Sequence, residues 1–170
     1  MQSLFQTFSA IARLIVRAAA TVVLPALVIL PQSHAQQGEQ TFQPAQYQIE
    51  GVLAYCGDIQ TIVRPQSEPL IFAPDGFRII INGPAFNDLP RGVRLFLYYH
   101  TCGTIFYGDD LALADSFAVR SGARGQWLLA ADLEFICQTD NLVGAGWHFA
   151  PDSARCENIV DLMIEALDRQ

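Results

Sequence analysis

NGPAFNDLPRGVRLFLYYHTCGTIFY, residues 82–107, contains the helix on which the fold depends. Asn87 or Asp88 can cap a helix whose first turn tolerates Pro90. A 4-3-4-3-4 spacing then repeats along one face of the predicted helix, through Leu89, Val93, Phe96, His100, Gly103 and Tyr107. From Leu95 to Tyr107 the other faces are also mostly apolar. The pattern therefore predicts a central, buried helix.

The segments on either side of this helix differ in character. Before it, β-like runs punctuated by glycine and proline occupy Ile49–Cys56, Ile59–Arg64 and Phe77–Asn82. These runs predict a small antiparallel sheet. After it, helical patterns cover about 109–120, 123–137 and a last segment, capped by Asp152 or Ser153, that ends near Arg169. Strands followed by helices indicate a single α+β domain over residues 49–170.

The first 35 residues have the pattern of an export signal. Arg13 and Arg17 precede an uncharged stretch, Ala18–Leu30, and small residues around Ala35 suggest cleavage after that residue. An uncleaved anchor is the alternative, but 13 residues interrupted by proline are short for a bilayer. We therefore expect a periplasmic or secreted protein with a signal peptide over 1–35, a glutamine-rich mobile tether over 36–48, and no integral membrane span after cleavage.

Composition and charge exclude two classes of protein. Hydrophobic residues make up 51% of the chain, which is too many for a disordered protein. Beyond residue 35 the chain has 17 acidic residues against eight arginines and no lysine, a net charge of −9. Such a charge repels nucleic-acid phosphates and anionic membrane surfaces, so we expect no nucleic-acid partner.

Four cysteines, Cys56, Cys102, Cys137 and Cys156, follow the export signal. In an oxidising compartment four cysteines predict two disulfides, and the absence of a CxxC spacing gives no support to a zinc ribbon or a thioredoxin-type motif. Three pairings are open. Because Cys137 and Cys156 bracket a short loop, we favour that pair, together with Cys56–Cys102.

Three segments that follow one another in the chain together form a series of motifs. An NGP turn leads into LFLYYHTCGT around His100, and ADSFAVR follows from Ala114 to Arg120. This order resembles exported HExxH zinc metallopeptidases of the gluzincin type. Downstream, His148 and Arg155 resemble the H-P-x-x-x-x-R segment of that family with one residue inserted. The resemblance spans residues 77–162 and implies a metallopeptidase-like core.

Zinc hydrolysis in such enzymes depends on helix geometry. Histidines at i and i+4 share one face and bind Zn²⁺, the glutamate between them activates water, and a third ligand comes from the next helix. The resemblance puts His100 at the first ligand position, Thr101 at that of the general base and Thr104 at that of the second histidine. Leu111 stands at the third ligand position, with Asp110 beside it and one residue out of register.

These replacements predict a non-catalytic site. A neutral hydroxyl is a weak zinc ligand and cannot accept a proton from water near neutral pH. Thr101, Thr104, Asp115 and Arg155 would then only support a former site, with Asp115 bonding to His100. A rebuilt zinc site from His100, His148 and Asp110 is the alternative, and it requires these three residues to converge.

Three functions remain open from the sequence. The first is an exported pseudoenzyme that binds a peptide or protein segment in a binding or regulatory role, without a cofactor. The second is an active zinc-dependent peptidase with a rearranged ligand set, and the third is a structural envelope protein. The arginine pairs Arg91/Arg94 and Arg120/Arg124 are interpreted as solvated helix faces.

Overall fold

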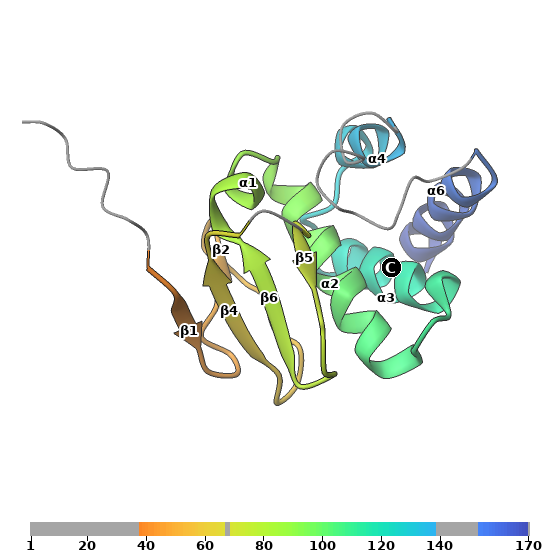
Figure 1. Cartoon of the computed structure of the whole chain (residues 1–170). Helices are drawn as coiled ribbons and strands as arrows, with labels where there is room; N and C mark the ends of the chain where they lie inside the picture. Colours follow the sequence, from red (N-terminus) through yellow and green to blue (C-terminus); the bar gives the residue numbers. More distant parts are fainter. Residues whose placement is uncertain (1–37, 67–68, 139–152, 170) are drawn as a thin grey trace, which may run out of the picture. The chain divides into compact units, whose positions relative to one another are not determined.

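The computed structural model describes residues 38–66, 69–138 and 153–169 (Figure 1). The chain divides into two units, and the description below concerns the second, Ala35–Gln170. The predicted signal peptide, its cleavage site and His148 lie outside the described residues. In the second unit strands come first and helices follow, so the predicted α+β class is confirmed.

The main sheet has four strands in the order β1-β4-β6-β5. Its central pair is β4, Gln60–Arg64, and β6, Arg78–Asn82, which run parallel in register from Gln60↔Arg78 to Arg64↔Asn82. The two edge strands, β1 (Gln40–Phe42) and β5 (Ile71–Phe72), pair antiparallel with β4 and β6. The sheet is therefore mixed, which corrects the expectation of an antiparallel one.

The path of the loop between β4 and β5 explains the parallel pair. Arg64 ends β4 opposite Asn82, and β5 begins with Ile71 opposite Ile81, so this loop starts and ends at the same end of the sheet. Asn82 holds the loop there: its side-chain amide donates to the Gln66 carbonyl at 2.7 Å, and its backbone N–H donates to Leu70 O at 2.8 Å. The chain then returns as β5 and turns into β6, parallel to β4.

The fold begins earlier in the chain than the sequence predicted. β1 lies within the expected tether over 36–48, where it extends the sheet, and Tyr47 is buried. The predicted run Ile49–Cys56 is a hairpin instead, made of β2 (Gln48–Ile49) and β3 (Val52–Leu53). Its turn is formed by Glu50 and Gly51, both with positive φ, as a tight hairpin turn requires.

Five helices follow in the described residues: α1 Gly83–Asn87, α2 Arg91–Tyr107, α3 Leu111–Gly125, α4 Ala130–Cys137 and α6 Ser153–Asp168. The predicted cap at Asn87 or Asp88 is wrong, because these residues end α1 and Pro90 precedes the first turn of α2. Pro84 lies in the first turn of α1, where a missing N–H costs nothing. The chain thus breaks once before the long buried helix begins.

The boundary between α3 and α4 also differs from the predicted ranges. α3 continues to Gly125, and Gln126 ends it in the left-handed conformation. A Cβ on Gly122 would lie 2.5 Å from Leu128 Cβ, so only glycine allows the chain to fold back this closely. The Trp127 N–H donates to Gly122 O at 3.1 Å and fixes this return.

The helices pack in succession away from the sheet (Figure 1). α2 contacts β5 and β6 on one side and α3 on the other, while α6 packs on α3. Leu95, Phe96 and Leu97 are fully buried, which confirms that this helix is central. Each such side chain contributes about 1.5–3 kcal/mol through its burial. α6 is peripheral by comparison, and Ile159 is its buried hydrophobic residue.

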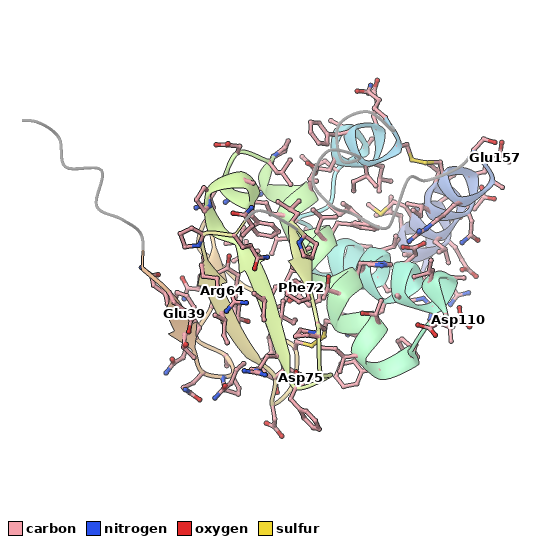
Figure 2. All side chains as sticks on the ribbon, viewed as in Figure 1. Glu39, Arg64, Phe72, Asp75, Asp110 and Glu157 are labelled. Carbon is pink, nitrogen blue, oxygen red and sulfur yellow. A yellow bond between two sulfur atoms is a disulfide. The ribbon has the colours of Figure 1, made fainter. Side chains whose placement is uncertain are left out.

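Both disulfides have the pairing that the sequence favoured, Cys56–Cys102 and Cys137–Cys156 (Figure 2). The first joins the loop after β3 to α2. The second joins the end of α4 to the first turns of α6, and no cysteine is left free. Within the described ranges, none of the helices has the length and apolar character needed to cross a bilayer.

Candidate functional site

A buried ionic cluster joins the three helices that the motif comparison singles out. It consists of His100 on α2, Asp115 on α3 and Arg155 on α6. His100 Nδ1 lies 2.8 Å from Asp115 Oδ1, and the Arg155 guanidinium donates to both Asp115 oxygens, at 2.7 and 2.8 Å. The predicted contact between His100 and Asp115 is therefore confirmed.

The three side chains of this cluster are largely buried, so the charge of Asp115 must be compensated within the protein. The Asp115 side chain is fully buried, and those of His100 and Arg155 are 7% and 16% exposed. A buried carboxylate is tolerated only when its charge is compensated and its oxygens are hydrogen-bonded. The two-point contact from Arg155 meets both needs. The Phe96 ring stacks on the His100 imidazole with centroids 6.2 Å apart, which fixes the ring further.

The register between α2 and α3 shows what lies beside the cluster. A Cβ on Gly103 would meet Ala114 Cα at 2.7 Å, so the two helices touch at this point. The helices form a hairpin with His100 opposite Asp115. One turn further along α2 is Thr104, and one turn back along α3 is Leu111. The positions that the resemblance assigns to the missing zinc ligands therefore lie on facing turns.

The side chains on those turns have other partners or no ligating atom. Thr104 Oγ1 donates to Thr101 O at 2.8 Å, a bond within α2 itself. Leu111 offers only carbon atoms and is 43% exposed. Thr101 is buried, and its hydroxyl carries no charge that could activate water. The residues that replace the zinc-binding set do not fit the metal.

Asp110 caps the start of α3. It is the N-cap of α3, and its Oδ1 accepts a hydrogen bond from the Leu113 N–H at 3.1 Å (Figure 2). No group of three His, Cys, Asp or Glu side chains that could hold a metal occurs among the residues described. Because His148 lies outside those residues, the convergence of His100, His148 and Asp110 stays a prediction.

Arg94 was expected on a solvated face, but it is buried. The residue is 7% exposed and pairs with Glu50 from the turn between β2 and β3. The sequence contained a signal for this, since Arg94 stands between Val93 and Leu95 at the start of the segment predicted to be apolar all round. Its ion pair ties α2 to the small hairpin.

Two tyrosines extend the buried polar region toward the sheet. Tyr47 and Tyr98 lie with ring centroids 5.8 Å apart, and the Tyr98 hydroxyl bonds to Thr61 Oγ1 at 3.0 Å. Burial raises the pKa of each phenol to about 12, from an ordinary value of 10.0. Both rings are therefore neutral throughout the physiological pH range.

Comparison of this chain with protein-family models, with curated proteins and with solved structures finds no match. The assignment of function therefore depends on the side chains themselves. Their arrangement can hold three helices together around a buried carboxylate.

Proposed function

We propose that this chain is an exported metallopeptidase-like protein that has lost zinc hydrolysis and binds a peptide or protein segment as a pseudoenzyme. One observation supports the proposal: His100, which the motif resemblance puts at the first zinc-ligand position, contacts Asp115, and Asp115 is paired with Arg155. A catalytic zinc needs three protein ligands and an open position for water. Here the facing turns supply a bonded hydroxyl and a leucine.

The proposed compartment is the periplasm or the exterior of the cell. Two disulfides fit an oxidising compartment, and the leader has the pattern of a cleavable signal. A pseudoenzyme there would act by occupying or presenting a segment of another exported protein.

The edge of the sheet that β5 forms beside α2 is the proposed binding surface. β5 is an edge strand with β6 as its one neighbour in the sheet, and it contacts α2. An extended segment can add to such an edge through main-chain hydrogen bonds. Because the binding energy then comes from the backbone of the partner, no metal or activated group is needed.

Metal content tests the loss of hydrolysis. Elemental mass spectrometry of residues 36–170 should find much less than one zinc per chain. The variant Thr101→Glu/Thr104→His/Leu111→Glu should bind one zinc, because it restores three ligands and a base on facing turns. The matched control, with Leu111→Gln instead of Leu111→Glu, should bind zinc more weakly.

Two results would contradict this proposal. One zinc per wild-type chain, lost in His100→Ala and in His148→Ala, would show that an active site has been rebuilt, and peptide cleavage should then be assayed. A folded triple variant that holds no more zinc than its control would show that the helices lack zincin geometry.

Hydrogen exchange tests the binding surface. A partner captured by cross-linking from the exported fraction should slow the exchange of the β5 amides at residues 71–72. The opposite edge strand, β1, serves as the control and should exchange as before. Protection confined to β1 or to α6 would place the partner elsewhere and reject the β5 edge.

A further inference from the structure

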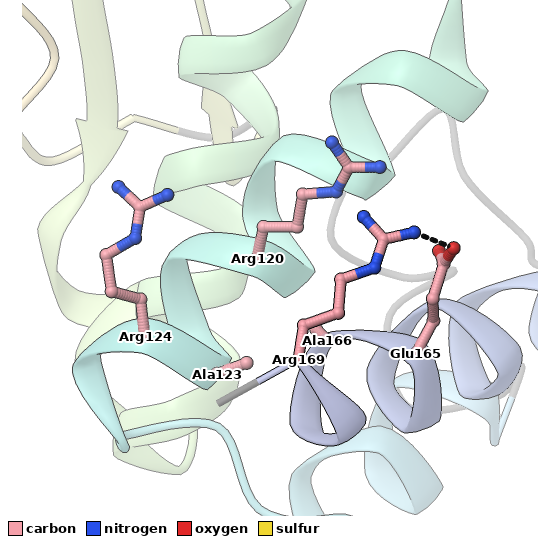
Figure 3. A pocket seen from close by; sticks show the side chains of 6 residues that line it. All are labelled: Arg120, Ala123, Arg124, Glu165, Ala166 and Arg169. Atoms are coloured by element: carbon pink, nitrogen blue, oxygen red, sulfur yellow. Dashed lines mark hydrogen bonds and ion pairs between the residues drawn. The ribbon is translucent and has the colours of Figure 1, made fainter.

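A pocket of about 500 Å³ opens between α3 and α6, away from the buried cluster (Figure 3). Arg120 and Arg124 reach it from α3, and Arg169 reaches it from α6. The remaining lining residues are Ala123, Glu165 and Ala166. Since alanine side chains are short, the space between the guanidinium groups stays open.

The charge of this pocket is opposite to that of the molecule. Three of the eight arginines beyond residue 35 lie here, in a segment whose net charge is −9. Arg169 pairs with Glu165, while the described residues include no carboxylate in an ion pair with Arg120 or Arg124. The lining of the pocket contains one carboxylate, that of Glu165, and it pairs with Arg169 rather than with Arg120 or Arg124.

Helix-end electrostatics explains part of this arrangement. α3 ends at Gly125 and α6 at Asp168, and cations near helix C-termini are stabilised by the backbone dipoles. The stabilisation by the dipole falls off within the last turn, so it applies to Arg124 and Arg169. Arg120 precedes the last turn of α3, so the helix dipole does not explain its place in the pocket.

We propose that the α3–α6 pocket binds a phosphomonoester. The Arg120 and Arg169 guanidinium groups extend toward one another, while that of Arg124 extends to the opposite side (Figure 3). Two guanidinium groups that come from different parts of the chain suit a tetrahedral dianion, because its oxygens point in several directions and can accept paired N–H donors. A carboxylate is planar, and one arginine can satisfy both of its oxygens. The volume is that of a small-ligand site, and the rest of the molecule to which the phosphate is attached would lie over Ala123 and Ala166.

Glu165 controls access to Arg169. Its carboxylate is paired with the Arg169 guanidinium in the ligand-free protein (Figure 3). A phosphate that binds both Arg120 and Arg169 must take over the donors that Glu165 now uses. Removal of the Glu165 charge should therefore strengthen binding, while loss of an arginine should weaken it.

Titration with inorganic phosphate and glycerol 1-phosphate, at constant ionic strength, tests the site. Calorimetry should show saturable binding that weakens at least tenfold in Arg120→Gln and in Arg169→Gln. Arg91→Gln removes the same charge from an exposed position outside the pocket and should change affinity less than twofold. Glu165→Gln should tighten binding severalfold, whereas Glu157→Gln on the same helix should not.

The other outcomes either overturn the proposal or identify the source of the phosphate group. No saturable binding, or equal losses in Arg91→Gln and Arg120→Gln, would reduce the pocket to a solvated face and overturn the proposal. Equal gains in Glu165→Gln and Glu157→Gln would show that only net charge matters and would overturn it too. Phosphatidic acid vesicles form the second arm: sedimentation with them, without affinity for glycerol 1-phosphate, would identify a lipid headgroup as the source of the same chemistry.

Discussion

The charged side chains at the two ends of the α3–α6 interface lie in opposite environments, one buried and one exposed. Near the starts of these helices, Asp115 and Arg155 form a buried ion pair, and His100 contacts Asp115. Near their ends, Arg120 and Arg124 surround an open pocket with Arg169. The same pair of helices thus carries a closed ionic cluster and an open one. Burial decides between the roles: charge that is fully compensated inside serves the fold, and charge left facing solvent is available to a ligand.

The largest expected effect comes from breaking the closed end. Asp115→Ala should lower the free energy of unfolding by about 3–5 kcal/mol, because it leaves the Arg155 guanidinium largely buried without its carboxylate. Urea denaturation measures this loss. Asp161→Ala, at an exposed position on α6, is the control and should cost under about 0.5 kcal/mol. A loss below about 1 kcal/mol for Asp115→Ala would mean that the cluster does not hold the helices.

His100→Ala should cost somewhat less, about 2–3 kcal/mol, from the cavity and the lost contact with Asp115. The effect is smaller because Arg155 continues to compensate the carboxylate. A double-mutant cycle with Asp115→Ala should show strong coupling between the two residues. Simple additivity would indicate that the 2.8 Å contact between Nδ1 and Oδ1 contributes little.

Alkaline pH should weaken the buried region through its two tyrosines. The folded-state pKa values of Tyr47 and Tyr98 are raised from 10.0 to about 12, so their contribution is complete below pH 10 and is lost as the pH rises from 10 toward 12. At pH 11 each tyrosine should have lost roughly 1.4 kcal/mol. Tyr47→Phe should make the decline between pH 9 and pH 11 shallower; an unchanged slope would show that Tyr47 ionises as easily in the fold as in the unfolded chain.

The smallest effect on stability is expected at the open end. Arg124→Gln should change the free energy of unfolding by no more than about 0.5 kcal/mol, since the side chain is exposed. Arg155→Gln, the same substitution at the closed end, should cost several times more. Thermal and urea unfolding of the two variants compares them directly. Similar losses would show that the pocket arginines are structural after all.

The central helix could be predicted because its pattern of apolar residues is contained in one continuous segment of the sequence. The run of apolar residues from Leu95 predicted a buried helix, and Leu95–Tyr98 are buried. The prediction was wrong for the end of the helix, where Phe106 and Tyr107 are 56% and 44% exposed. The contact of His100 with Asp115 came from the motif resemblance, and the structure supplies its distance. Burial of Arg94 was missed because charge was given more weight than its two apolar neighbours.

Other features depend on how distant segments meet. A run of β-forming residues does not reveal its direction, and β4 lies parallel to β6 only because the loop after Arg64 is held at the end of the sheet by Asn82. The α3–α6 pocket was not predictable for the same reason. Arg120 and Arg124 are exposed, as predicted, but no pattern in the sequence of either helix states which of its faces meets the other helix.

The order of the disulfides along the chain has a consequence for biogenesis. Each cysteine pairs with the next one in sequence, Cys56 with Cys102 and Cys137 with Cys156, so the two covalent loops neither overlap nor enclose each other. An oxidant that joins cysteines as they emerge from a membrane, first with first, produces the native pairs directly. Maturation of this protein in an oxidising compartment would then need a thiol oxidase and no isomerase to reshuffle its bonds.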